Sequence, residues 1–186
     1  MKCDYKINGG VVSLSSVHQA ANAAVRNLLI DFGIVFEALV GNVLYTDSST
    51  DRTVLLTDFN HRCCYCEKKL TIDTMEKDHL IPMNKTYVGL HAWGNLVPAC
   101  HSCNSKKSGK EWMSFLLGKC GGKKGKVFTR RHNMIIDHVN KYGYDQLTTT
   151  NIRKISQLAN DLHRDVVLSL NQIHDKYQRN MYKPFL

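Results

Sequence analysis

The sequence predicts an α+β fold in which a small core of two strands and one helix carries a four-cysteine metal site and is enclosed by helical segments. Two C-x-x-C pairs bracket the stretch 63–103, with short apolar runs interrupted by prolines between them. Apolar residues at helical spacing fill the chain on both sides. We therefore expect a helical segment 1–60, a core 61–112, and a basic loop with a helical segment 113–186, together forming one compact unit.

The cysteines Cys63, Cys66, Cys100 and Cys103 have the spacing of structural zinc ligands. Each C-x-x-C turn presents two thiolates, and two such turns complete the tetrahedron that Zn²⁺ prefers. A disulfide framework fits poorly, because seven cysteines are an odd number and the chain shows no export signal. A redox role would explain one pair and leave the other unexplained. The neighbouring Cys64 could replace Cys63 as a ligand.

Two short strands followed by a helix are expected inside this frame. The run 75–82 ends in apolar residues stopped by a proline, and the run 95–100 leads into the second C-x-x-C pair. From Asn104 onward the sequence is polar and compatible with a helix. Adjacent side chains on a strand point to opposite faces. If Asp78 and His79 serve one site, the strand must therefore bend or end there.

Helices are expected on both sides of this core. Ser16–Leu39 is rich in alanine and has helical apolar spacing, with an interruption near Gly33. Shorter helices are expected at 51–60, 110–117 and 127–142. The tail carries a long apolar stripe, formed by Ile152, Ile155, Leu158, Leu162, Val166, Leu170, Ile173 and Tyr177. The stripe predicts packing against the N-terminal helices, and a homodimer interface is the alternative.

The central motifs resemble a known enzyme family. Asp-His-Leu-Ile-Pro at 78–82, followed by Asn-Leu-Val-Pro-Ala-Cys-His-Ser-Cys-Asn at 95–104, is similar to the HNH endonuclease family, whose core is the ββα-metal fold. The similarity extends over residues 62–112 and includes the paired C-x-x-C elements of the zinc-containing branch. It implies hydrolysis of DNA phosphodiester bonds with one divalent ion, leaving 5′-phosphate and 3′-hydroxyl ends.

The resemblance also implies roles for four catalytic residues. His79 is the expected general base, since imidazole titrates near neutral pH. Asp78 and Asn104 match the ligands of a catalytic Mg²⁺ or Mn²⁺, which would stabilise charge on the scissile phosphate. Asn95 matches the asparagine that braces the loop between the strands and so orients His79. Capping, surface or phosphate-contacting roles are expected for the nearby histidines His61, His91 and His101.

The net charge of +9 is concentrated just after the predicted site. Residues 104–131 hold nine basic side chains against the single acidic Glu111, whereas residues 1–60 are net acidic. Such a cluster is typical of phosphate binding and supplies affinity rather than sequence readout. A solvated flexible loop is the alternative. The residues expected to contact nucleic acid are Lys106, Lys107, Lys110, Lys123, Lys124, Lys126, Arg130 and Arg131.

The sequence therefore predicts an HNH-type endonuclease acting on double-stranded DNA, with structural Zn²⁺ and catalytic Mg²⁺ or Mn²⁺. Restriction-type, phage or mobile-element, and defence roles remain open. The alternative is a non-catalytic zinc-dependent nucleic-acid-binding protein. An RNA substrate is disfavoured because the sequence shows no aromatic stacking pattern. A two-metal mechanism is disfavoured because no carboxylate cluster surrounds the motif. No apolar run approaches the roughly 20 residues of a membrane span, and unpaired cysteines favour a reducing cytoplasm.

Overall fold

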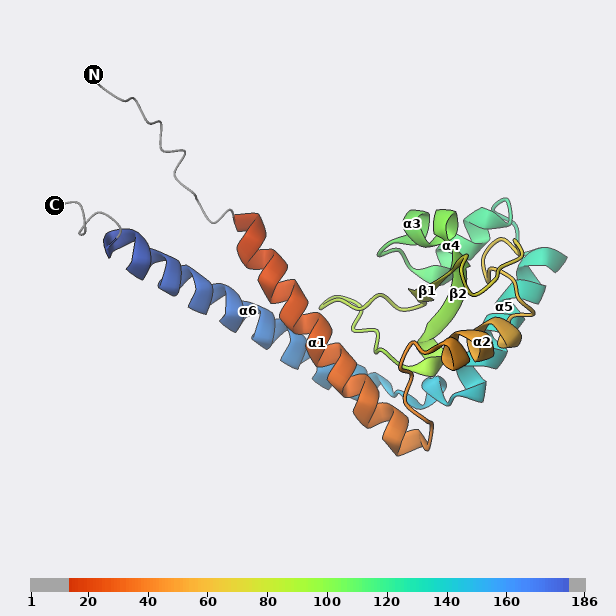
Figure 1. The fold of residues 1–186 in the computed structure, drawn as a ribbon, viewed down its shortest axis with the longest axis horizontal. Coiled ribbons are helices and arrows are strands. Elements are labelled where there is room, and N and C mark those ends of the chain that lie inside the picture. Colours follow the sequence, from red (N-terminus) through yellow and green to blue (C-terminus); the bar gives the residue numbers. More distant parts are fainter. Residues whose placement is uncertain (1–13, 181–186) are drawn as a thin grey trace, which may run out of the picture.

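Two long helices form an arm beside a body built around a two-stranded sheet (Figure 1). The computed structural model describes residues 14–180. The arm consists of α1 (Leu14–Val40) and α6 (Thr149–Asn180), which lie side by side and make the most extensive contact between any two helices. No described helix combines the length and the apolar character needed to cross a membrane.

The body is an α+β unit. Its sheet pairs β1 (Met75–His79) with β2 (Leu96–Cys100) in antiparallel register, so that Met75 lies opposite Cys100 and His79 opposite Leu96. All residues of β2 are buried. The surrounding elements are α2 (Ser49–Asp58), η1 (Trp93–Asn95), α3 (His101–Lys107), α4 (Trp112–Lys119), α5 (Lys126–Lys141) and η2 (Tyr144–Gln146).

The order strand, loop, strand, helix is confirmed, with two differences at the boundaries. β1 ends at His79 rather than at Pro82, because the side chain of Asn95 hydrogen-bonds the backbone of Ile81 in place of a partner strand. Asn95 itself lies in the 3₁₀ turn η1, and β2 begins one residue later. The strand therefore ends at the Asp-His pair, where a bend or an end was expected.

α1 runs through Gly33 without the predicted interruption. Glycine costs about 1 kcal/mol in a helix interior relative to alanine. Here a side chain would clash with the carbonyl oxygen of His91, so the missing side chain lets the loop before β2 lie directly on the helix. The glycine therefore marks a contact between the arm and the body.

Two hydrophobic clusters hold the molecule together. One surrounds the four cysteines and the sheet, and the other joins α1 and α6 to the segment 88–92. In the tail stripe, Ile155 is buried against α1, as expected. Leu158, Ile173 and Tyr177 are at least half exposed, so that part of the stripe is not covered within this chain.

Candidate active site and metal centre

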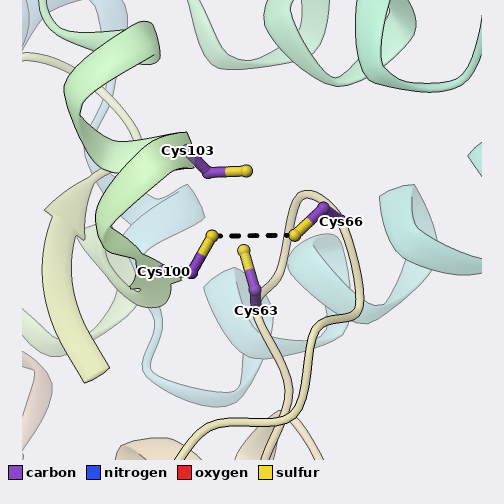
Figure 2. A group of neighbouring side chains, drawn as sticks. All are labelled: Cys63, Cys66, Cys100 and Cys103. Atoms are coloured by element: carbon purple, nitrogen blue, oxygen red, sulfur yellow. Dashed lines mark hydrogen bonds between the residues drawn. The ribbon is translucent and has the colours of Figure 1, made fainter. Parts of the chain in front are cut away.

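The four predicted zinc ligands converge on one point. The Sγ atoms of Cys63, Cys66, Cys100 and Cys103 all lie within 4.8 Å of one another, and none of them forms a disulfide. Figure 2 shows that two thiols come from the loop after α2 and two from the junction of β2 with α3. The 3.7 Å between the sulfurs of Cys66 and Cys100 matches the separation of about 3.8 Å in a tetrahedral zinc–thiolate site.

The structure settles which of the adjacent cysteines belongs to this cluster. Cys64 is buried outside the group, and its backbone N–H donates to the carbonyl of Pro98 in β2. Cys63 is therefore the first thiol of the cluster. Four thiols fill a tetrahedral coordination shell, which fits a structural Zn²⁺ ion with no open position for a reacting molecule.

Two arginines of α5 bind the loop that carries Cys63 and Cys66. Arg130 makes a bidentate contact with the carboxylate of Glu67, and Arg131 donates to Glu67 and to the carbonyl of Tyr65. Glu67 has a positive φ of 60° at the tight turn of this loop. Both arginines were expected to contact nucleic acid. In the structure both pair with Glu67, but the side chain of Arg130 is still 58% exposed, whereas that of Arg131 is 12% exposed.

Asp78 is buried and is held from two directions. Its side chain accepts a hydrogen bond of 2.6 Å from the hydroxyl of Tyr65, which lies between the first two cysteines. The ammonium of Lys107 lies 3.1 Å from the same carboxylate oxygen. Burial raises the pKa of Asp78, whereas Lys107 and Tyr65 act in the opposite direction. Tyr65 and Lys107 thus connect the cysteine cluster and α3 to this carboxylate.

Lys107 is therefore not part of the basic surface predicted for it. It is completely buried, pairs with Asp78, and donates a 2.6 Å hydrogen bond to the carbonyl of His79. Five of the predicted lysines do lie exposed, on α3 and in the region up to the start of α5. These are Lys106, Lys110, Lys123, Lys124 and Lys126.

Replacement of Lys107 by methionine should destabilise the protein. The substitution keeps the aliphatic stem but leaves the carboxylate of Asp78 buried without its cation, which typically costs about 3–5 kcal/mol. The expected result is a lower urea midpoint with zinc present. Lys106→Met changes an exposed neighbour and should alter stability by less than about 0.5 kcal/mol. Equal midpoints for the two variants would show that the buried ion pair contributes nothing.

Asn95 has the bracing geometry expected of it. The side chain is fully buried. Its oxygen accepts a 2.8 Å hydrogen bond from the N–H of Ile81, and its amide nitrogen donates to the carbonyls of Ile81 and Leu90 at 3.0 and 2.8 Å. One side chain thus ties together the two ends of the loop that follows His79.

One ring nitrogen of His79 faces a partner, and the other has none among the described residues. Its Nε2 lies 3.1 Å from Nδ1 of His91. His79 Nδ1 has no hydrogen-bond partner among the described residues, and the residue is half-buried. Burial, followed by the charges of neighbouring groups, lowers the pKa of His79 to about 3, so the ring is neutral at pH 7.

Asn104, the predicted partner of Asp78 in holding a divalent ion, is hydrogen-bonded to Glu76. Its Nδ2 donates a 2.7 Å hydrogen bond to Glu76, which also contacts the ring of His101 at 2.6 Å. α3 thus sets Asn104 against Glu76 and Lys107 against Asp78. Glu76 was missed by sequence reasoning, although its position two residues before Asp78 places it on the same face of β1.

The predicted donors fit a hard divalent ion by their chemistry. Carboxylate and amide oxygens are the ligands that Mg²⁺ and Mn²⁺ prefer. Asn104 turns its amide nitrogen to Glu76, which leaves its oxygen for another partner. The carboxylate of Asp78 has more lone pairs than Tyr65 and Lys107 occupy. The ammonium of Lys107, however, opposes a second cation beside Asp78.

Comparison with known proteins identifies the segment that holds this geometry. Residues 63–110 match the model of the family described as HNH endonuclease. This segment is an HNH endonuclease domain. The Septu protein PtuB of Bacillus thuringiensis is 41% identical over 59 residues, which make up 30% of this chain and 23% of that protein. The chain thus spans about a quarter of the length of this curated relative. No solved structure matches the chain.

The HNH domain contains every element of the predicted site. β1 contributes Asp78 and His79, η1 contributes Asn95, and α3 contributes Asn104. The four-cysteine cluster lies at the end of the sheet from which α3 starts. His91 is one residue of the domain whose contact with His79 could not be read from the motif.

Proposed function

We propose that the protein is a metal-dependent endonuclease that hydrolyses DNA with His79 as the general base. The observation that carries this proposal is the geometry of the His79 ring, which is half-buried, held through Nε2, and without a hydrogen-bond partner at Nδ1 among the described residues. A general base needs a free lone pair within reach of the reacting water, and it works best with a pKa near the operating pH. The lowered pKa of His79 keeps the ring neutral at pH 7 but makes it a weaker base than an ordinary imidazole.

His79 acts on the water that attacks the phosphorus atom. As the new P–O bond forms, the proton of the water passes to Nδ1, and the bond from phosphorus to the 3′ oxygen breaks. The leaving oxygen takes a proton from solvent, which gives 5′-phosphate and 3′-hydroxyl ends. Lys107 fixes the backbone carbonyl of His79, and Asn95 holds the loop that carries His91. Both residues position the base and take no part in proton transfer.

Asp78 and Asn104 would hold one Mg²⁺ or Mn²⁺ ion through their side-chain oxygens. When bound, such an ion neutralises charge on the scissile phosphate. The Zn²⁺ proposed for the cysteine cluster is structural, because its four thiolates leave no coordination position open. Through Cys103, this ion would hold the first turn of α3 and thereby the positions of Asn104 and Lys107.

The exposed lysines provide the proposed contact with DNA. Lysines of this kind bind phosphates and release counterions, so each contact adds about one unit to the slope of log affinity against log salt. Among the biological roles left open by the sequence, we propose the defence nuclease, which agrees with the similarity to a Septu protein.

Removal of two loop lysines should weaken DNA binding and reduce its salt dependence. Lys123→Gln with Lys124→Gln is expected to lower the salt slope by about 2 on a labelled DNA duplex, measured by fluorescence anisotropy without Mg²⁺ or Mn²⁺. Arg153→Gln with Lys154→Gln removes two adjacent exposed charges from α6 and should leave the slope near that of the wild type.

Equal salt slopes for the two double variants would show that Lys123 and Lys124 do not contact DNA. Parallel cleavage assays on duplex DNA, single-stranded DNA and duplex RNA test the substrate class. The proposal predicts cleavage of duplex DNA. Faster cleavage of RNA would show that RNA, and not DNA, is the preferred substrate.

One observation favours the alternative of a binding protein without catalysis. The ammonium of Lys107 already neutralises Asp78, the carboxylate that would hold the catalytic ion. A protein of that class would retain DNA affinity and show no cleavage with any divalent ion.

A further inference from the structure

The ring of His91 contacts the ring of His79 through a single pair of nitrogens. His79 Nε2 and His91 Nδ1 are 3.1 Å apart, and their ring centroids are 5.3 Å apart. Only one hydrogen can occupy the space between these two nitrogens. The contact therefore has two forms, and they have opposite consequences for His79.

In the first form the hydrogen belongs to His79 Nε2 and is donated to His91. The other nitrogen of His79, Nδ1, then carries a lone pair and can accept a proton. In the second form His91 donates and His79 Nε2 accepts, so that Nδ1 of a neutral His79 carries the hydrogen. Nδ1 then has no free lone pair. The tautomer of His79 thus decides whether Nδ1, the nitrogen not in contact with His91, is basic.

Contacts with α1, with Tyr45 and through the neighbouring Leu90 fix the position of His91 beside His79. A side chain at Gly33 would clash with its carbonyl oxygen, so its backbone rests against α1. Its ring meets the edge of the Tyr45 ring at 5.6 Å between centroids. The preceding residue, Leu90, is fixed through its carbonyl by Asn95 and through its N–H by the hydroxyl of Tyr144.

We propose that His91 is a positioning residue that accepts the Nε2 hydrogen of His79 and thereby keeps His79 Nδ1 as the atom that takes the proton from water. The assignment rests on the proposed function of His79. Outer partners of this kind typically contribute about 10–100-fold to activity. The arm helix α1, which carries no residue of the HNH motif, thus supports the catalytic base through the backbone of His91.

The kinetic test compares two replacements of His91 in the full chain loaded with zinc. His91→Phe keeps a ring against Tyr45 but removes both nitrogens, and it should lower kcat by about 10–100-fold with little change in KM. His91→Gln provides an amide oxygen that can accept the Nε2 hydrogen, and it should recover a substantial part of the lost kcat. Zinc content and thermal midpoint are measured for both variants.

A purely structural role for His91 would give a different pattern. His91→Phe and His91→Gln would then change kcat in proportion to their loss of thermal midpoint, with no advantage for the amide. A wild-type kcat in folded His91→Phe would overturn the proposal.

A spectroscopic measurement separates this proposal from the proposed nuclease function. Nitrogen-15 shifts of the histidine rings report which nitrogen carries the hydrogen, and they require no activity. The wild type should show His79 as the Nε2–H tautomer, and His91→Phe should show a mixture or a changed Nε2 shift. A wild-type His79 protonated at Nδ1 would refute the role of His91 even in an active enzyme. An inactive wild type with the Nε2–H tautomer would refute the nuclease function alone.

Discussion

His79→Ala is expected to lower the rate of metal-dependent DNA cleavage by about 10²–10⁴-fold, the usual contribution of a positioned general base. The loss should fall on kcat, because the ring contributes its Nδ1 lone pair to the reaction and not a phosphate contact. DNA affinity should stay near that of the wild type, because the exposed lysines remain in place. Single-turnover cleavage of a labelled duplex measures the rate, and anisotropy measures the affinity.

A second histidine variant serves as the control for this prediction. His18→Ala removes an exposed ring from α1, where it stacks on His163 of the arm and lies outside the HNH domain. It should cleave at a rate close to that of the wild type. A His79→Ala protein that retained its thermal midpoint and cleaved within about threefold of the wild-type rate would remove His79 as the base, since a general base contributes far more than that.

Cys103→Ser is expected to abolish zinc binding and, with it, the folded HNH domain. Structural zinc sites contribute about 10–16 kcal/mol of apparent binding free energy, which is comparable to the whole stability of a typical domain, about 5–15 kcal/mol. Cys103 lies in the first turn of α3, so zinc loss also releases Asn104 and Lys107 from their partners on β1. Zinc stoichiometry and the thermal midpoint are the measurements.

Cys120→Ser is the matched control for the zinc prediction. Cys120 follows α4, lies outside the four-thiol cluster and contacts Arg131 through its sulfur at 3.5 Å. It should retain one zinc per chain and a midpoint within a few degrees of the wild type. If Cys103→Ser kept both its zinc and its midpoint, the cluster would not be the structural metal site.

Sequence reasoning identified the parts of the core that depend on local spacing. The C-x-x-C turns place two thiols each whatever the surrounding fold, and the structure brings all four together. The order strand, loop, strand, helix follows from short apolar runs and their prolines, and it is confirmed. The bracing geometry of Asn95 came from the family resemblance, and the hydrogen bonds to Ile81 and Leu90 have that form.

The features that could not be predicted depend on partners far away in the sequence. Lys107 stands in a run of basic residues that indicates solvent exposure, and its burial follows from Asp78, 29 positions earlier. Arg130 and Arg131 are engaged by Glu67, more than 60 positions away. The continuity of α1 at Gly33 depends on contact with the loop before β2. Intrinsic propensity and charge patterns carry no information about such contacts.

The most direct test of the central claim is the conversion of supercoiled plasmid by the zinc-loaded protein. Reactions contain Mg²⁺, Mn²⁺ or no added divalent ion, and chelators are omitted so that the four-thiol site keeps its zinc. The account predicts nicked or linear DNA only in the reactions with Mg²⁺ or Mn²⁺. Plasmid that stays supercoiled with every ion, while a gel shift shows it bound by folded, zinc-containing protein, would contradict the nuclease function and favour a binding protein.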